Sequence, residues 1–295
     1  MRVNEEQWLA ERFEEHRPRL RSVAYRMLGS LAEADDAVQD AWLRLSGRQA
    51  DEIDNLGGWL TTVVARECLH MLRSRRRRRE DLVGDRLPDP VITAQGEILD
   101  PEHEALLADS VSLALLVVLD ALTPAERLAF VLHDMFDLPF DEIAGVIDRS
   151  PAAARQLASR ARRRVQGAPV PQPDDLAKQR KVVDAFYAAA DKGDFDGLVK
   201  VLAPDVVLRA DFGPNQPTRV YRGVAEVAKY ARRPRGAKLH PALINGQVGS
   251  VVTINDKPSS IMAFTVVDGK IVEIDGIRGA DRVWYLANAV LAGTA

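Results

Sequence analysis

The chain has 295 residues, of which 46% are hydrophobic and 28% charged, and its formal net charge is −3. This length suits about two domains, and the balance of apolar and charged residues is that of a folded chain rather than a disordered one. No stretch reaches the roughly 18 consecutive apolar residues that a membrane-spanning helix needs, and the Glu-rich first 16 residues lack the apolar core of a signal peptide. We therefore expect a cytoplasmic protein with no membrane partner.

The single cysteine, Cys68, cannot form an internal disulfide, and one Cys with five His residues does not suit a zinc module. Cys68 falls in a helical segment, where a small buried side chain is a better interpretation than a reactive thiol. We expect neither a metal nor a cofactor.

The charges are unevenly distributed. Residues 1–165 contain 23 Arg, no Lys and 29 acidic residues, whereas the remaining residues contain eight Lys. This difference suggests two parts with separate histories. Within the first part, basic clusters lie at residues 73–79 and 155–164. Local positive charge of this kind is typical of nucleic-acid-binding proteins, even where the whole chain is acidic.

The first part begins with three predicted helices. Apolar residues recur at helical spacing over residues 8–28 and 34–45, which predicts two helices with a short break between them. Ser30, followed three residues later by Glu33, predicts a capping box at the start of the second helix. A third helix is expected over residues 57–79, where the Arg-rich end suits the negative end of the helix dipole.

An acidic segment follows. Residues 80–108 contain prolines and eight acidic residues without periodicity, which predicts an extended linker. Such a segment could mimic a polyanion and occupy a basic nucleic-acid channel, or it could be a plain solvated tether.

Residues 106–164 are predicted to be helical again. A short helix, a turn near Asp148 and a helix capped by Ser150 make a helix-turn-helix layout, whose second helix lies in the major groove of DNA. Amide and guanidinium groups match base edges. The candidate base-reading residues on this helix are Arg155, Gln156, Ser159 and Arg160. A solvated helix face with a chance run of Arg is the alternative.

The pattern changes after a Pro-rich linker at residues 167–174. Two helices are predicted over residues 177–191 and 195–202, and they are followed mostly by strands. The expected strands are 206–210, 217–221, 239–246, 248–255, 260–267 and 270–277. Asp268 and Gly269 between the last two give the strongest hairpin signal. Helices followed by an antiparallel sheet indicate an α+β domain.

Three runs, residues 35–45, 57–78 and 122–165, resemble in order and spacing regions 2.2, 2.3–2.4 and 4 of the extracytoplasmic-function (ECF) group of sigma-70-type sigma factors. The resemblance implies a multi-domain protein that binds core RNA polymerase and promoter DNA. The implied domains are a region 2 helical bundle (1–79), the acidic linker (80–108), a region 4 helix-turn-helix (109–166), the Pro-rich linker (167–174) and a C-terminal domain (175–295).

The resemblance also implies which residues bind. The clamp helices of the largest polymerase subunit would contact Asp36, Gln39, Asp40, Trp42 and Leu43, while region 4 would meet the flap. The −10 element would be bound by Asn55, Trp59, Arg66, His70 and Arg73. The −35 element would be read by Arg155, Gln156, Ser159 and Arg160. Many family members carry an Arg-Asn pair where this chain has Ala65 and Arg66, so the resemblance does not imply which −10 bases it prefers.

Residues 175–295 resemble a SnoaL-like domain of the nuclear-transport-factor-2 (NTF2) superfamily, in which helices pack on a curved sheet to form a cone. A subgroup of ECF sigma factors carries this extension, which is implied to regulate the sigma factor in place of a separate anti-sigma protein. Residues 85–90, 211–215 and 278–283 resemble, in degenerate form, three short motifs of that subgroup. We expect this domain to act mainly through a structural regulatory contact. The alternatives are that a pocket of the cone offers Asp184, Tyr187, Asp211 and His240 to a small-molecule ligand or, third, to general-base catalysis.

We therefore expect an alternative sigma factor that is not an enzyme and has no catalytic residues. It would recognise −35 and −10 elements, help to open DNA, and be regulated by its fused C-terminal domain. A helix-turn-helix regulator with a ligand-sensing cone domain is the main alternative, although it would not need residues 30–79. A small-molecule enzyme with a DNA-binding appendage is the third interpretation.

Overall fold

The structure is a computed structural model of the chain, and it describes residues 2–47, 53–79, 86–94, 112–167, 172–213, 216–232 and 234–292. The chain forms two compact units. The helical unit comprises residues 1–82, 100–111 and 115–170, and the mixed unit comprises residues 83–99, 112–114 and 171–295. Residues 83–99 therefore belong to the mixed unit, although they lie between two helical parts of the sequence.

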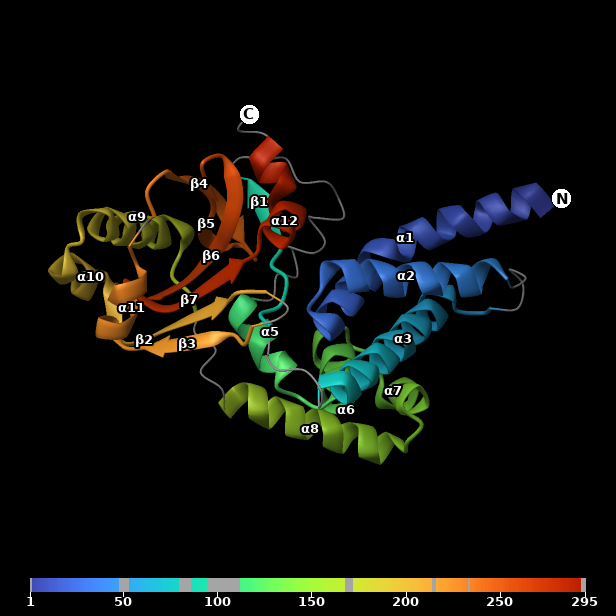
Figure 1. Cartoon of the computed structure of the whole chain (residues 1–295). Coiled ribbons are helices and arrows are strands. Elements are labelled where there is room, and N and C mark those ends of the chain that lie inside the picture. Colours follow the sequence, from blue (N-terminus) through green and yellow to red (C-terminus); the bar gives the residue numbers. More distant parts are fainter. Residues whose placement is uncertain are drawn as a thin grey trace. The chain divides into compact units, whose positions relative to one another are not determined.

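The helical unit begins with a three-helix bundle of α1 (Arg2–Leu28), α2 (Leu31–Ser46) and α3 (Leu56–Arg79), in which each helix packs against the other two (Figure 1). Cys68 of α3 is fully buried in this bundle, and burial raises the pKa of its thiol. The expected small buried side chain is confirmed.

The predicted capping box at the start of α2 is wrong. Ser30 is the N-cap residue, but its side chain makes no capping hydrogen bond. The carboxylate of Glu33 instead pairs with the guanidinium of Arg75, whose Nε donates to it at 3.2 Å. Arg75 of α3 therefore binds the Glu33 carboxylate, which in a capping box would accept a hydrogen bond from the backbone N–H of Ser30.

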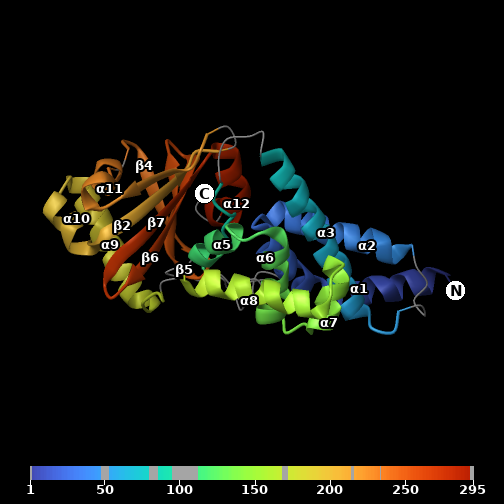
Figure 2. The same ribbon diagram turned by 90° about the horizontal axis from the view of Figure 1, so that it is seen from below.

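The helical unit continues with α5 (Leu113–Asp120), α6 (Pro124–Phe130), the π-helical turn η2 (Val131–Met135), α7 (Phe140–Ile147) and α8 (Pro151–Gly167). A capping box begins α6, because Thr123 Oγ1 accepts a hydrogen bond from Glu126 N while the Glu126 carboxylate accepts one from Thr123 N. Figure 2 shows these helices from below.

The mixed unit contains a seven-stranded sheet in the order β1-β4-β5-β6-β7-β2-β3, in which only the β2–β7 pair is parallel. The strands are β1 (Ile92–Ala94), β2 (Leu202–Asp211), β3 (Arg219–Arg222), β4 (Ala237–Ile244), β5 (Gln247–Ile254), β6 (Lys257–Val267) and β7 (Lys270–Arg278). The predicted hairpin at Asp268 and Gly269 is confirmed, since both residues have positive φ, as a tight two-residue turn requires.

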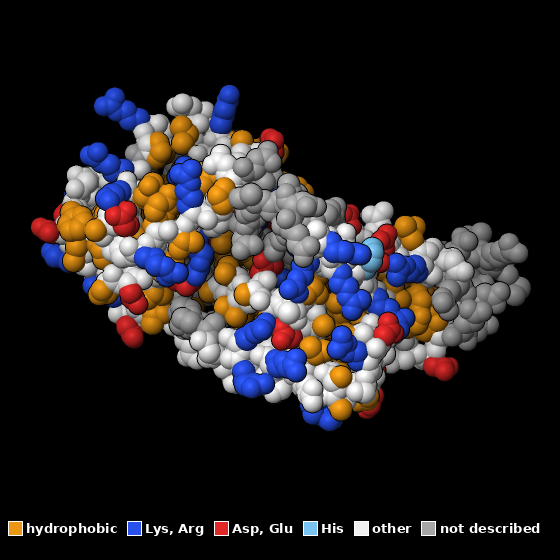
Figure 3. Space-filling model, turned by 60° about the horizontal axis from the view of Figure 1, so that its bottom comes forward, with side chains coloured by type: hydrophobic (Ala, Val, Ile, Leu, Met, Phe, Trp, Pro, Cys, Tyr) orange, Lys and Arg blue, Asp and Glu red, His pale blue; other side chains and the backbone are white. Residues whose placement is uncertain are grey.

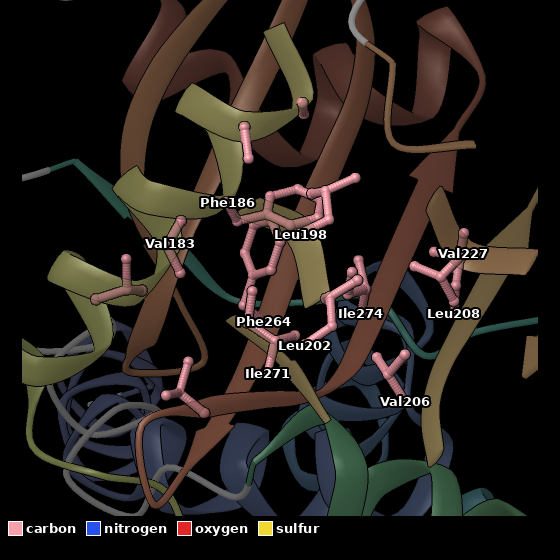
Figure 4. Packing of buried hydrophobic residues seen from close by; sticks show 14 residues of the cluster. Val183, Phe186, Leu198, Leu202, Val206, Leu208, Val227, Phe264, Ile271 and Ile274 are labelled. Atoms are coloured by element: carbon pink, nitrogen blue, oxygen red, sulfur yellow. The ribbon is translucent and has the colours of Figure 1, made fainter. Parts of the chain in front are cut away.

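Helices cover both faces of this sheet. On one face lie α9 (Leu176–Lys192), α10 (Phe195–Val201) and α11 (Val224–Tyr230), and on the other lies α12 (Ala280–Ala292) (Figure 1). Val183 and Phe186 of α9 point toward Phe264 of β6, and the rings of Phe186 and Phe264 meet edge to face with centroids 5.4 Å apart (Figure 4). The predicted α+β class is therefore confirmed.

Three elements of this unit, β1, α11 and α12, were not expected. β1 falls in the predicted acidic linker and pairs antiparallel with β4, with Ile92 opposite Ile244. Leu87, Val91 and Ile92 are buried, so this part of the segment is not a solvated tether. Another unexpected element is α12. Its buried Val283, Leu286, Ala287 and Val290 follow helical spacing, a signal that could have predicted it.

Candidate nucleic-acid interface and interregion clamp

The helix-turn-helix is built by α7 and α8. Asp148 ends α7 in the left-handed conformation, with φ of 53°, and Ser150 Oγ then accepts a hydrogen bond from Ala153 N at the start of α8. Alanines 154, 158 and 161 form the buried face of α8. Small residues at this spacing let α8 lie close against α6, so its larger side chains are left on the outer face.

All four predicted −35 residues lie on that outer face. The side chains of these four residues, Arg155, Gln156, Ser159 and Arg160, are all exposed. Figure 3, in which the bottom of Figure 1 comes forward, shows basic side chains (blue) over this part of the helical unit, and those of α8 are all Arg. The face therefore offers hydrogen-bond donors to base edges and phosphates.

Two further arginines of α8 form ion pairs within the unit, although their side chains stay partly exposed. Arg162 Nη2 lies 2.6 Å from the carboxylate of Asp134, and Arg164 Nη1 lies 2.8 Å from that of Glu126. Burial opposes ionisation of Glu126, but hydrogen bonds from Thr123 and the charge of Arg164 outweigh it and lower the pKa of this carboxyl. These pairs fix α8 against α6 and η2.

The predicted −10 residues occupy α3 and its start. Asn55 caps the helix, because its Oδ1 accepts a hydrogen bond from Gly58 N at 3.0 Å. Trp59 is half-buried, whereas Arg66, His70 and Arg73 are exposed at positions 7, 11 and 14 after it. This spacing places all four on one helix face.

That face contacts the second half of the helical unit. Arg66 Nη2 donates to the carbonyl oxygen of Gly145 in α7 at 2.8 Å. A cavity of about 330 Å³ separates the start of α3 from the loop that enters α7. Its lining includes His16, Arg19, Asn55, Thr61, Asp137 and Glu142.

A buried arginine connects the same two halves. Arg127 of α6 is only 2% exposed, and its Nε donates to the carbonyl oxygen of Arg26 in α1 at 3.0 Å. Its Nη1 donates to Asp120 at 3.1 Å. Because burying a charge is costly unless it is paired, this contact depends on both partners staying in place.

The predicted polymerase-binding residues lie along α2. Asp36, Gln39, Asp40 and Leu43 are exposed, and Leu43 is 59% exposed, which is unusual for a large apolar side chain. Trp42 is half-buried and packs on Phe13 of α1 with ring centroids 5.2 Å apart.

The four predicted pocket residues do not line one pocket. Asp184 is exposed on α9, and Tyr187 bonds to Ser250 Oγ at 2.5 Å beside the core. His240 lies on the opposite sheet face, 3.0 Å from Thr253 Oγ1. Alternation of side chains along the strands separates them, because residues on neighbouring positions of a strand point to opposite faces.

Asp211, the fourth of them, belongs to a different site. Its side chain is fully buried, and its Oδ2 accepts hydrogen bonds from Leu87 N at 3.0 Å and from Arg282 Nη1 at 2.6 Å. Arg282 also donates through Nη2 to Leu87 O and to Asp89 Oδ1, both at 2.7 Å. We call Asp211, Arg282 and Asp89, with the backbone of Leu87, the interregion clamp.

Asn245 extends the clamp along the same segment. Its Oδ1 accepts a hydrogen bond from Val91 N at 3.0 Å, and its own backbone N donates to Val91 O at 2.8 Å. The three degenerate motifs that sequence comparison singled out thus meet here. Arg282 was missed as a site residue, although it lies within one of those motifs.

A second charged group lies on the same face as Asp211. Arg209, two residues before Asp211 on β2, bonds to Asp275 at 3.0 Å and to Glu273 at 2.9 Å. Burial, with a further contribution from the charge of Glu273, raises the pKa of Asp275 to about 6 against the opposing effect of Arg209.

Across the described ranges, no helix is long and apolar enough to span a membrane. In the same part of the chain, no three or more His, Cys, Asp and Glu side chains are grouped so that they could hold a metal ion.

Comparisons with known proteins agree with this geometry. A model of sigma-70 region 2 matches residues 12–78, and a model of sigma-70 region 4 matches residues 112–165. The chain is 39% identical to the ECF RNA polymerase sigma factor SigJ of Mycobacterium tuberculosis over 288 residues, which cover 92% of this chain and 91% of that protein. It is 34% identical to the probable ECF RNA polymerase sigma factor SigI of the same species, with coverage of 88% and 89%.

The crystal structure of M. tuberculosis SigJ is similar throughout. It matches with a TM-score of 0.72 at 37% sequence identity, over 92% of this chain and 97% of that one.

Proposed function

Because the chain belongs to the ECF RNA polymerase sigma factors, transcription factors that bind RNA polymerase and promoter DNA, we propose that its C-terminal unit controls initiation by holding the segment between regions 2 and 4. The observation that carries this proposal is the interregion clamp, in which Arg282 and Asp211 bind the backbone and side chain of residues 87–89. The protein itself catalyses no reaction and acts in the cytoplasm, where polymerase and promoters are found.

The outer face of α8 reads the −35 element, and α3 binds the −10 element. This assignment is supported by the exposure of the side chains concerned. The −35 residues are all open on one helix face, and Arg66, His70 and Arg73 form a second row of donors on another. Phosphate contacts from neighbouring arginines would set the register, while the base contacts set the sequence preference.

The contact between Arg66 and Gly145 is incompatible with reading both elements at once. Elements centred at −35 and −10 lie about 25 base pairs apart, which is roughly 85 Å at 3.4 Å per base pair. Arg66 is expected at one element, whereas Gly145 lies just before the helix that reads the other. We infer that the helical unit must open before it can bind a whole promoter.

The clamp acts on the segment that this opening has to move. Residues 86–94 lie in sequence between α3 and α5, the elements that must separate, and their last three residues form the edge strand β1 of the sheet. Restraint of this segment within the same chain would replace a separate anti-sigma protein. The interior of the cone is filled by packed side chains such as Phe186 and Phe264, which favours a contact role over a ligand-binding one.

The exposed face of α2 meets the polymerase. Asp36 and Asp40 give it negative charge and Leu43 gives it an apolar anchor, a combination suited to a specific protein interface. Reversing the charge with Asp40→Lys is expected to weaken binding to core polymerase.

Run-off transcription with bacterial core polymerase tests the proposal. Three full-length proteins would be compared on a promoter library: wild type, Arg282→Ala, and Arg222→Ala, which removes an exposed arginine of the same unit outside the clamp. Arg282→Ala is expected to raise the yield of core-dependent transcripts, and Arg222→Ala to leave it unchanged. Equal yields from all three would reject control by the clamp. Duplex binding without any core-dependent transcript would favour a helix-turn-helix regulator instead.

A further inference from the structure

Three side chains, His133, Phe140 and Arg155, form a column of ring and guanidinium contacts that ends on the recognition helix α8. The rings of His133 and Phe140 are stacked, with centroids 3.9 Å apart and planes tilted by 34°. Cζ of Arg155 lies 5.2 Å from the centroid of the same Phe140 ring. A guanidinium at this distance is attracted by the negative face of the ring.

Each member comes from a different element. His133 belongs to the π-helical turn η2, Phe140 is the first residue of α7, and Arg155 is on α8. π-helical turns are rare and occur frequently at functional sites. The turn that carries His133 also carries Asp134, which binds Arg162 of α8 at 2.6 Å. A single irregular turn thus holds α8 at two positions about two helical turns apart.

The lower part of the column is fixed by its own contacts. His133 Nδ1 lies 3.0 Å from the carbonyl oxygen of Leu138, so this nitrogen carries the proton that it donates. Phe140 is half-buried, which leaves its ring little freedom, whereas Arg155 is exposed and has no such enclosure. The direction of the Arg155 guanidinium is therefore set largely by the ring beneath it.

We propose that Phe140 is a positioning residue that aims Arg155 at one base pair of the −35 element and so helps to set the base preference at that pair. The inference rests on the proposed function, namely that α8 reads the −35 element. A side chain already held in its bound direction loses less conformational freedom on binding, and this gain applies only at the base pair that Arg155 contacts.

The test measures transcription from promoters in which every −35 base pair is substituted in turn, with full-length protein and core polymerase. The variants are Arg155→Ala, Phe140→Leu, Phe140→Tyr and the double variant Phe140→Leu with Arg155→Ala. Phe140→Leu removes the aromatic face and keeps an apolar side chain, whereas Phe140→Tyr keeps the face. Thermal unfolding and the −10 preference of each variant report on general structural damage.

Arg155→Ala is expected to abolish discrimination at one base pair. Phe140→Leu is expected to reduce discrimination at that same pair by about two- to five-fold, the range of an exposed cation–π contact. Phe140→Tyr should restore it, and the double variant should be no worse than Arg155→Ala.

Two results would overturn the proposal, and they differ in what they imply for the reading of −35 DNA by α8. If Arg155→Ala acts at one pair while Phe140→Leu changes nothing, or weakens all pairs equally, Phe140 is not a positioning residue and the reading of −35 DNA by α8 stands. If Arg155→Ala alters no −35 preference, the role of Arg155 in the proposed function fails, and the inference fails with it.

Discussion

Arg282 and Asp211 are 71 residues apart in the sequence, yet Arg282 Nη1 donates to Asp211 Oδ2 at 2.6 Å, and both bind Leu87. One arginine of the last helix and one aspartate of the sheet therefore hold a segment that precedes both of them by more than a hundred residues. All of these contacts lie within the mixed unit.

Removing Arg282 is expected to release the segment. Arg282→Ala removes the guanidinium that pairs with the buried Asp211 and with Asp89, and breaking a buried pair in this way costs about 3–5 kcal/mol. Hydrogen exchange would show it as loss of protection at the Val91 amide, which donates to Asn245. The Arg222→Ala protein serves as the matched control, and equal protection of Val91 in both variants would contradict the role given to Arg282.

Asp275 should give the mixed unit a defined pH dependence. Its pKa rises from 3.8 in the unfolded chain to about 6 on folding, so the folded state holds this proton more tightly. The contribution of Asp275 to unfolding free energy is therefore most favourable below pH 4 and falls as the pH rises through 6, by up to about 3 kcal/mol.

Hydrogen exchange of β6 and β7 amides between pH 4 and 7.5, compared with the Asp275→Asn protein, measures this effect. The stability of the wild type relative to the variant should fall over that range. Curves that stay parallel would show that Asp275 is already ionised throughout.

A comparison of variants at Arg160 and Arg163 distinguishes base reading from phosphate binding by α8. Arg160→Ala is expected to cost about 1–3 kcal/mol at a matching −35 element and to relax the preference at one position. Arg163→Ala removes a neighbouring exposed arginine and should weaken all sequences equally. Transcription from −35 variants distinguishes the two, and identical profiles for both proteins would remove Arg160 from the base-reading set.

We expect the buried Arg127 to stabilise the closed state of the helical unit, in which Arg66 contacts Gly145. Arg127→Ala leaves Asp120 and the carbonyl of Arg26 without their donor, and we expect a loss of about 3–5 kcal/mol in the stability of the closed arrangement. Thermal unfolding gives the size of the loss. Arg149→Ala, which removes an exposed arginine from the turn before α8, should have little effect.

Local patterns were sufficient to predict much of the fold. The cap at Ser150 and the turn at Asp268 and Gly269 depend on residues only a few positions apart, so the sequence contains the whole signal. The exposed face of α8 could be predicted in the same way, because helical periodicity separates Arg155 and Gln156 from the alanines that face α6.

The features that were missed depend on distant partners. β1 is only three residues long and exists because β4 offers it an edge, so its own sequence gives no strand pattern. The failed capping box at Ser30 has the same origin, since the competing Arg75 is 42 residues from Glu33. The four predicted pocket residues do not line one pocket, because residue type shows which side chains could react but not on which sheet face they lie.

The distance between the two halves of the helical unit tests the central claim most directly. Spin labels at Ala32→Cys on α2 and Ala152→Cys on α8 are feasible because both positions are exposed and the native Cys68 is buried. We expect a short distance in the free protein, where Arg66 contacts Gly145. In a transcribing complex with core polymerase and promoter we expect an increase of tens of ångströms, since the two elements lie roughly 85 Å apart. An unchanged distance in a complex that makes transcripts would contradict this expectation.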